Sequence, residues 1–215
     1  MILYWFLLLL IAVVAYGVGS MSTMVIASNF VFRTSLRRLG KGNVWLSNFR
    51  RIYGVWGAVR LLLTELVKDA LPILFGALLL GFKGHADVGR AFAGLCLVLG
   101  RLYPLFYDFK GSHATVCMIC MGLFINPSLG IAAAVVAAAV TWFSRYVALG
   151  TLAGTLVLVV ASLLLVDNDL ILKLIFIAAG LIFFKHLPAI SRMLNGREFR
   201  LSFEEDITYK LDQKF

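Results

Sequence analysis

Charged residues are scarce in this chain of 215 residues: they make up 14% of it, whereas 61% of the residues are hydrophobic and the mean hydropathy is +0.94. Soluble domains are about half apolar and about a quarter charged. The shortage of charge therefore excludes an ordinary soluble domain. Several windows of about 18 or more residues are almost uncharged, which is typical of transmembrane helices rather than of helices in a soluble core.

Cysteine is also scarce, and its three copies, Cys96, Cys117 and Cys120, all lie in apolar runs. Cys117 and Cys120 have the spacing of a redox pair, but no alternation of strands and helices surrounds them. A buried cysteine behaves as a small hydrophobic residue. We therefore expect no redox centre, no metal site and no other cofactor.

A positively charged segment is missing before the first apolar run, residues 2–27. A secretory signal peptide has such a segment and a shorter apolar stretch, so we interpret this run as a membrane span. The chain also lacks an internal repeat of about 20–50 residues. Many transporters contain repeats, so a small-solute transporter is the least favoured class.

The uncharged windows are continuous rather than alternating, which favours helices over the strands of a barrel. The sequence therefore predicts an all-α polytopic membrane protein that forms a single domain over residues 1–215. An odd number of spans places the two termini on opposite sides of the membrane. The seven predicted spans cover residues 2–27, 54–80, 91–108, 114–125, 128–143, 147–166 and 170–185.

The basic residues are divided unequally between the two sides of these spans. Segments 28–53, 101–113 and 144–146, together with Lys185 and the tail from 186 to 215, hold 15 of the 20 Lys and Arg residues. The positive-inside rule makes this side cytoplasmic, with the N-terminus outside and the C-terminus inside. Topology and anionic lipid together explain the net charge of +9. Membrane lipid is thus an expected partner and nucleic acid is not, while the oligomeric state stays open.

The densest basic segment, residues 33–51, contains six Lys and Arg residues and lies on the cytoplasmic side. Glycines in the Gly40–Asn43 turn allow a backbone geometry that exposes N–H groups to an anion. Asn43, Ser47 and Asn48 add neutral donors, and arginine can bind phosphate through two parallel hydrogen bonds. This pattern indicates a phosphate site at the membrane surface. A loop that only sets topology is the alternative.

Residues 100–113 form a second polar segment on the same side. Pro104 is expected to end or bend the helix that precedes it. The Gly111-Ser112 step predicts a tight turn into the next span, whose N-terminus attracts anions. His113 can titrate near neutral pH, although a single histidine at a membrane boundary can equally be a packing residue.

A third polar segment lies at and just past the end of the last predicted span and contains Lys185, His186 and Pro188 with Arg192, Gly196 and Glu198. Arg145 lies on the same side. Charges also occur inside the second span, where they are costly and face a cavity or one another. Among them, Lys68 can pair with Glu65 or with the adjacent Asp69. A structural ion pair is therefore an alternative to a binding role for Lys68.

These segments, in this order, resemble the motifs of the PlsY family, which are bacterial membrane acyltransferases that use acyl phosphate and glycerol 3-phosphate. The resemblance covers nearly the whole chain, and the topology predicted above is also the family's. The family patterns are G-S-G-N-x-G-A-T-N-x-x-R, D-x-x-K-G-x-x-P, G-H-x-F-P-x-F-x-x-F-K-G-G-K-G, R-Y-x-S and H-R-E-N-x-x-R-L-x-x-G-x-E. They are similar to Gly40–Arg51, Glu65–Pro72, Gly100–Ala114, Arg145–Ala148 and His186–Glu198.

Several positions inside these motifs differ from the family pattern. Lys41 stands where the family has serine, Arg101 where it has histidine, and His113 where it has lysine. The Arg-Glu-Asn of the last motif is replaced by residues 187–189, Leu-Pro-Ala. Residues expected to support the fold match the family pattern better than residues expected to form the site.

The resemblance implies an enzyme of phospholipid synthesis in the bacterial plasma membrane, with its active face in the cytoplasm. Its reaction would transfer an acyl group from acyl phosphate to the sn-1 hydroxyl of glycerol 3-phosphate, giving lysophosphatidate and phosphate. A divergent relative that is inactive or uses another acceptor, and that binds an anionic lipid or a partner, is the alternative. Acyl phosphate is already activated, so positioning and charge stabilisation can supply much of the catalysis without a covalent intermediate.

The resemblance also implies roles for individual residues. His186 and Asn48 are the predicted catalytic residues, with His186 orienting the attacking hydroxyl or accepting its proton. The remaining predicted site residues bind substrate. Glycerol phosphate is oriented by Asn43 and Ser47 together with Asn48, and phosphate is bound by Lys68, Lys110 and Arg145. The other predicted substrate-binding residues are Gly42, Arg101, Gly111 and His113.

Overall fold

The structure is a computed structural model that describes residues 2–26, 46–109, 111, 113–198 and 201. The chain divides into two compact units. The larger contains Met1–Met21 and Leu66–Phe199, and the smaller contains Ser22–Glu65 and Arg200–Phe215. The prediction of a single domain stays a prediction.

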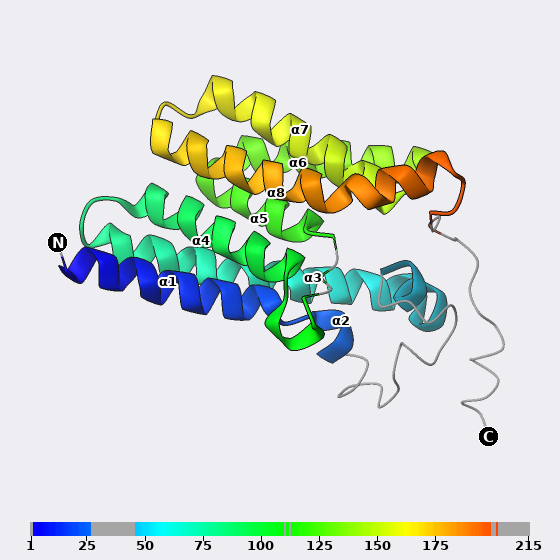
Figure 1. Cartoon of the computed structure of the whole chain (residues 1–215), viewed down its shortest axis with the longest axis horizontal. Helices are drawn as coiled ribbons and strands as arrows, with labels where there is room; N and C mark the ends of the chain where they lie inside the picture. The colour runs from blue at the N-terminus through cyan, green and yellow to red at the C-terminus, as the bar shows by residue number, and fades with distance from the viewer. Residues whose placement is uncertain (1, 27–45, 110, 112, 199–200, 202–215) are drawn as a thin grey trace. The chain divides into compact units, whose positions relative to one another are not determined.

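All regular structure in the described part of the chain is helical, which confirms the predicted fold class. Each of the seven predicted spans corresponds to a helix, and Figure 1 shows these helices with their labels. The elements are α1 (Ile2–Ser20), α2 (Thr23–Ile26), α3 (Leu46–Gly81), α4 (Ala86–Leu102), the 3-10 helix η2 (Leu105–Tyr107), α5 (Thr115–Ile125), α6 (Pro127–Ser144), α7 (Val147–Leu165) and α8 (Asp169–Leu194).

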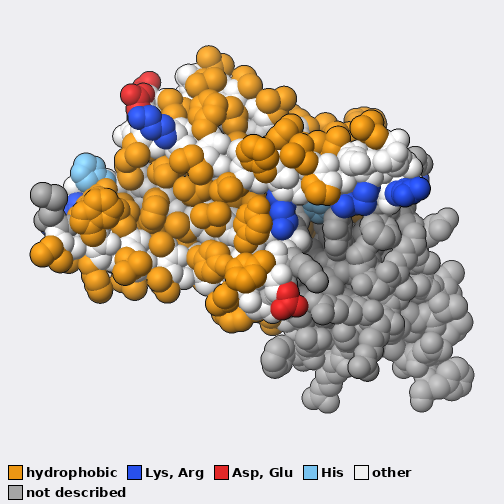
Figure 2. Space-filling model, viewed as in Figure 1, with side chains coloured by type: hydrophobic (Ala, Val, Ile, Leu, Met, Phe, Trp, Pro, Cys, Tyr) orange, Lys and Arg blue, Asp and Glu red, His pale blue; other side chains and the backbone are white. Residues whose placement is uncertain are grey.

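Four helices of the described residues are long and apolar enough to cross a membrane, namely α1, α6, α7 and α8, and α5 is a shorter apolar helix. Their outward faces carry large hydrophobic side chains such as Phe6, Leu164 and Phe184, each more than half exposed. Figure 2 shows apolar side chains over most of the described face of the larger unit. Such a surface suits a lipid environment, because apolar side chains that face lipid tails do not incur the free-energy cost of exposure to water.

Several predicted boundaries were wrong. Helix α1 ends at Ser20 rather than at residue 27, and α4 covers 86–102 rather than 91–108. The predicted effect of Pro104 is confirmed, because α4 ends at Leu102 and Pro104 precedes η2. Helix α3 begins at Leu46, and non-helical Gly54 (φ 75°) divides it where the second span was expected to begin.

Helix α8 extends to Leu194, nine residues beyond the predicted end of the last span. His186 and Pro188 therefore lie inside a helix rather than in a tail. Proline removes one helical hydrogen bond and bends the helix, but a membrane helix can tolerate it when the neighbouring structure compensates. His186 consequently has a defined direction toward the interior, where it is 2% exposed.

Small residues allow the helices of the larger unit to approach closely. A Cβ added at Gly19 or Gly100 would lie closer than 3.0 Å to the backbone of the other helix of the α1–α4 pair. Gly76 of α3 and Gly89 of α4 make an equivalent contact with each other. Close backbone approach at small residues is typical of helix packing in membranes, where the hydrophobic effect does not drive association.

Helix α4 lies at the centre of the larger unit, where it packs on α1, α5 and α8 and contacts α3 through Gly89. Its interior residues, such as Leu97 and Leu102, are fully buried. The last turn of α4 carries Arg101 into this interior, where it is 6% exposed. A buried cation at this position requires compensating groups nearby, and these groups begin the candidate site.

Candidate functional site

Asp69 of α3 is the centre of a buried ionic cluster. Its Oδ1 accepts a hydrogen bond from Lys68 Nζ at 2.6 Å, and its Oδ2 accepts one from the Cys117 thiol at 3.1 Å. Arg101 Nη2 lies 3.9 Å from the same Oδ2, and Lys68 Nζ also donates to the Val18 carbonyl at 3.2 Å. The Asp69 cluster, as we call these five residues, therefore joins α1, α3, α4 and α5.

The side chain of Asp69 has no solvent exposure, and those of Lys68 and Arg101 are 17% and 7% exposed. Buried charges persist only where counter-charges and hydrogen bonds compensate them, and here both compensations are present. The predicted alternative of a structural ion pair between Lys68 and Asp69 is confirmed. Lys68 and Arg101 can still offer charge to an anion, but Asp69 holds them in place.

His113 and His186 form a second polar pair, the histidine pair. His113 lies just before α5 and His186 lies on α8; their rings are stacked, with centroids 4.8 Å apart. Nδ1 of His113 is 2.6 Å from Nε2 of His186, and Nδ1 of His186 is 2.7 Å from the Ile182 carbonyl. The structure thus brings together two predicted site residues that are 73 positions apart in the sequence.

The environment of His113 lowers its pKa from 6.5 to about 3, chiefly because burial disfavours the charged ring, and secondarily because of the nearby charges of His186 and Arg192. His113 is therefore neutral at physiological pH. The lysine expected at this position from the family pattern would instead supply a permanent positive charge.

This pKa shift makes the stability of the protein depend on pH. Between pH 6.5 and about 3 the unfolded chain binds a proton at His113 that the folded chain does not, so the folded state loses stability as the pH falls. We expect the thermal midpoint in detergent to fall between pH 7 and about pH 5, and to fall less in the His113→Gln variant. Equal decreases in the two proteins would contradict the shift.

Arg192 and Glu198 form an ion pair beyond the histidine pair, with Arg192 Nε 2.6 Å from Glu198 Oε2. The Glu198 side chain is 2% exposed, whereas that of Arg192 is 46% exposed. The bond folds the chain after Leu194 back onto the last turns of α8. Sequence reasoning placed both residues in the third polar segment but not in the site, because no local spacing rule pairs them.

The segment between α4 and α5 is held in an unusual backbone conformation. Asp108 and Phe109 have φ of 52° and 56°, a left-handed region that is uncommon for residues other than glycine. At Gly111 an added Cβ would lie closer than 3.0 Å to the Arg101 and Leu102 carbonyl oxygens. The turn before His113 is therefore seated directly on the end of α4, and only glycine fits there without a shift.

The structure places the other predicted site residues as follows. Arg145 ends α6 with a left-handed backbone (φ 61°) and is exposed in the turn to α7. Residues 42, 43 and 110 lie outside the described residues, as do the side chains of Ser47 and Asn48, which belong to the first turn of α3. The predicted phosphate segment 33–51 is thus described only in its last part. No group of three potential metal ligands occurs among the described residues.

The fold and these clusters together define an all-helical membrane protein with buried ionic and histidine groups near the end of α4 and the start of α5. The model of the glycerol-3-phosphate acyltransferase family matches residues 9–196. The chain therefore belongs to this family, and the predicted membership of the PlsY family is confirmed.

Relatives and solved structures agree with this assignment. A glycerol-3-phosphate acyltransferase from Paraburkholderia xenovorans is 31% identical, covering 90% of each chain, and one from Finegoldia magna is 29% identical over 90% of this chain and 96% of its own. The crystal structure of PlsY, an integral membrane glycerol 3-phosphate acyltransferase, in its glycerol 3-phosphate form is 25% identical, with a TM-score of 0.76 over 97% of this chain and 98% of that chain. Its lysophosphatidic acid form gives a TM-score of 0.75 over 90% and 94%.

Proposed function

We propose that this protein transfers an acyl group from acyl phosphate to the sn-1 hydroxyl of glycerol 3-phosphate, producing lysophosphatidate and inorganic phosphate. The observation that carries the proposal is likeness over nearly the whole chain to a structure solved in two forms, one named for glycerol 3-phosphate and the other for lysophosphatidic acid. These compounds are the acceptor and the product of the proposed reaction.

The described residues suit a reaction without a covalent enzyme intermediate. The thiols of Cys96, Cys117 and Cys120 are buried, and that of Cys117 donates to Asp69. Acyl phosphate needs no further activation, so the protein has to align it with the hydroxyl and stabilise the charge of the leaving phosphate. Lys68, Arg101 and Arg145 are the described cations that we assign to the phosphate groups. We also assign Lys110 to phosphate, and Asn43 and Asn48 to the orientation of glycerol phosphate; these three lie outside the described side chains.

The proposed function is tested with purified, folded protein in detergent. Acyl phosphate and labelled glycerol 3-phosphate are supplied, and labelled lysophosphatidate is measured, with heat-denatured protein as the control. Reactions with acyl-CoA as donor and with glycerol as acceptor test the requirement for each phosphate. We expect product only with acyl phosphate and glycerol 3-phosphate. Folded protein that forms no lysophosphatidate would contradict the proposal, and turnover of glycerol would show a different acceptor.

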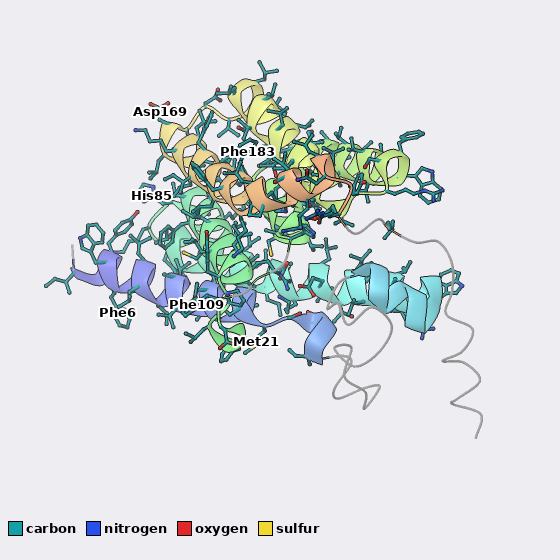
Figure 3. The ribbon with its side chains drawn as sticks, turned by 45° about the vertical axis from the view of Figure 1, so that its right-hand side comes forward. Phe6, Met21, His85, Phe109, Asp169 and Phe183 are labelled. Atoms are coloured by element: carbon teal, nitrogen blue, oxygen red, sulfur yellow. The ribbon has the colours of Figure 1, made fainter. Side chains whose placement is uncertain are left out.

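We further propose that the N-terminus faces outward and that the active face is cytoplasmic, in the plasma membrane of a bacterium. Figure 3 supports one part of this arrangement: Phe6, His85 and Asp169 lie toward the same end of the larger unit, whereas Met21 lies away from them, past the other end of α1. Lysines and arginines such as Arg145 and Arg197 belong to helix ends that the positive-inside rule assigns to the cytoplasm.

Labelling of introduced cysteines tests this orientation. Lys83 and Arg197 are exposed, and the native cysteines are buried, so a membrane-impermeant maleimide should report mainly the new thiol. In intact cells we expect Lys83→Cys to be labelled, and Arg197→Cys to be labelled only after the cells are opened. The reverse pattern would show that the protein is inserted the other way.

A further inference from the structure

Lys185 of α8 has an aromatic ring rather than a carboxylate as its partner. Its Nζ lies over the ring of Tyr103, 4.4 Å from the ring centroid. Among the residues that the structure describes, no carboxylate forms an ion pair with Lys185 and no oxygen accepts a hydrogen bond from it. A ring face attracts a cation but carries no net charge, so this contact holds the Lys185 ammonium without neutralising it.

Tyr103 itself is fixed in place at the end of α4. Its backbone N–H donates to the Leu99 carbonyl at 2.9 Å, and its carbonyl oxygen accepts a hydrogen bond from the Tyr16 hydroxyl at 2.7 Å. Helices α4 and α8 pack against each other (Figure 1). The Tyr103 ring therefore sets the position of Lys185 beside the end of α4 that also carries Arg101.

Lys185 lies where the lipid-facing surface of α8 meets the predicted cytoplasmic side. It is the final residue of the last predicted span, and its side chain is partly buried. Its neighbours Phe184 and Leu187 are 69% and 45% exposed, as expected of side chains that face lipid tails. Lysine at such a level lays its aliphatic part along apolar surface and keeps its charge at the interface. An anion anchored in the bilayer by its own chain can reach this charge.

We propose that Lys185, held by the Tyr103 ring, binds the phosphate of the acyl phosphate donor while the acyl chain of the donor stays in the bilayer beside α8. Lys185 is then a binding residue for the donor and not for glycerol 3-phosphate. This inference rests on the proposed function. Position 185 precedes the last family motif, so the motifs assign it no role.

The chemistry of the donor distinguishes it from other phosphates at a membrane. In acyl phosphate, the phosphate is bonded directly to the acyl group, so its charge lies at the level where the chain begins. In lysophosphatidate and in bilayer phospholipids, a glycerol unit separates the chain from the phosphate. A cation flanked by lipid-facing side chains suits the first arrangement, in which it can donate charge-assisted hydrogen bonds to phosphate oxygens.

Chemical labelling of Lys185 tests binding without activity. Acetylation of amines in the purified protein in detergent is measured by mass spectrometry, with Lys173, which is exposed in the first turns of α8, as the internal control. The probe is hexadecyl phosphate, which joins a chain to a phosphate but has no acyl group to transfer. We expect a saturating concentration to slow acetylation of Lys185 by about 5-fold or more and to leave Lys173 unchanged.

Three further ligands at the same concentration distinguish the sources of phosphate. We expect weaker protection of Lys185 by lysophosphatidate, and none by inorganic phosphate or phosphatidylglycerol. Protection by phosphatidylglycerol equal to that by hexadecyl phosphate would show contact with bulk anionic lipid and overturn the inference. Equal protection by inorganic phosphate, or no protection by hexadecyl phosphate, would overturn it as well.

Kinetics test the selectivity for the donor. Methionine keeps most of the length of lysine but has no charge. We expect Lys185→Met to raise the KM for acyl phosphate by about 10-fold, with kcat and the KM for glycerol 3-phosphate within about 2-fold of the wild type. The matched control, Lys173→Met, removes the same charge from the other end of α8 and should leave all three constants unchanged. An equal rise in the KM for glycerol 3-phosphate would overturn the assignment to the donor.

Substitutions of Tyr103 test the role of the ring. Tyr103→Leu removes the ring, so we expect the KM for acyl phosphate to rise by about 3-fold because Lys185 loses its fixed position. Tyr103→Phe, the conservative variant, keeps the ring and should bring this KM back toward the wild-type value. Equal KM values for the two variants would show that the ring does not position Lys185.

Failure of this inference can be distinguished from failure of the proposed function. An active wild type with an unchanged donor KM in Lys185→Met would overturn the role of Lys185 alone. Absence of turnover in the folded wild type would overturn the proposed function, while protection of Lys185 by hexadecyl phosphate would still support a site for a chain-bearing phosphate.

Discussion

Replacing Asp69 by alanine is expected to lower the free energy of unfolding by about 3–5 kcal/mol, because the substitution leaves buried cations without their counter-charge. Asp69 has no solvent exposure and receives Lys68 Nζ, the Cys117 thiol and the more distant Arg101 guanidinium. Asp69→Ala therefore removes two hydrogen bonds and one longer ion-pair contact at once. The loss extends beyond one helix, since the cluster joins α1, α3, α4 and α5.

The matched control is Asp87→Ala, which removes the same side chain from an exposed ion pair with Arg90 on α4. Exposed pairs contribute about 0–1 kcal/mol, so this variant should remain close to the wild type. Unfolding by SDS in mixed detergent micelles measures both variants under the same conditions. An Asp69→Ala loss no larger than that of Asp87→Ala would show that the cluster does not stabilise the fold.

Alanine at position 111 is expected to reduce kcat by about 100-fold, because a displacement of about 1 Å near reacting groups can have an effect of that size. The added Cβ would lie closer than 3.0 Å to the carbonyl oxygens of Arg101 and Leu102, which belong to the last turn of α4. The turn must therefore move, and His113 moves with it.

Gly180→Ala is the control for this substitution. Gly180 lies within α8, and nothing lies within 4 Å of a Cβ added there, so alanine should leave both activity and stability near the wild type. Initial rates with acyl phosphate and glycerol 3-phosphate measure the two variants side by side. Equal rates for Gly111→Ala and the wild type would show that the position of this turn does not limit the reaction.

The helices could be predicted from sequence because long uncharged windows have few alternatives to a membrane helix. Their ends could not be predicted as well. Composition does not reveal that α1 ends at Ser20, and it gave no reason to continue α8 through Pro188. A proline within an apolar run can end a helix or only bend it, and the surrounding packing decides between these outcomes.

In the candidate site, too, contacts between neighbours in the sequence could be predicted, whereas contacts between distant residues could not. Lys68 and Asp69 are adjacent, so their pairing could be predicted as an alternative, but Cys117 is 48 residues from Asp69 and no spacing rule connects them. The contact between His113 and His186 depends on how α8 packs beside the start of α5. Gly111 was predicted from its turn-forming sequence, yet its requirement for glycine comes from the end of α4.

The most direct test of the account measures inorganic phosphate and lysophosphatidate in the same reaction, for the wild type and for Asn48→Ala. Asn48 is one of the two predicted catalytic residues. We expect the wild type to form the two products in equal amounts, and Asn48→Ala to form both at least about 10-fold more slowly while remaining folded. Phosphate release without matching lysophosphatidate, or an Asn48→Ala rate equal to that of the wild type, would contradict the account.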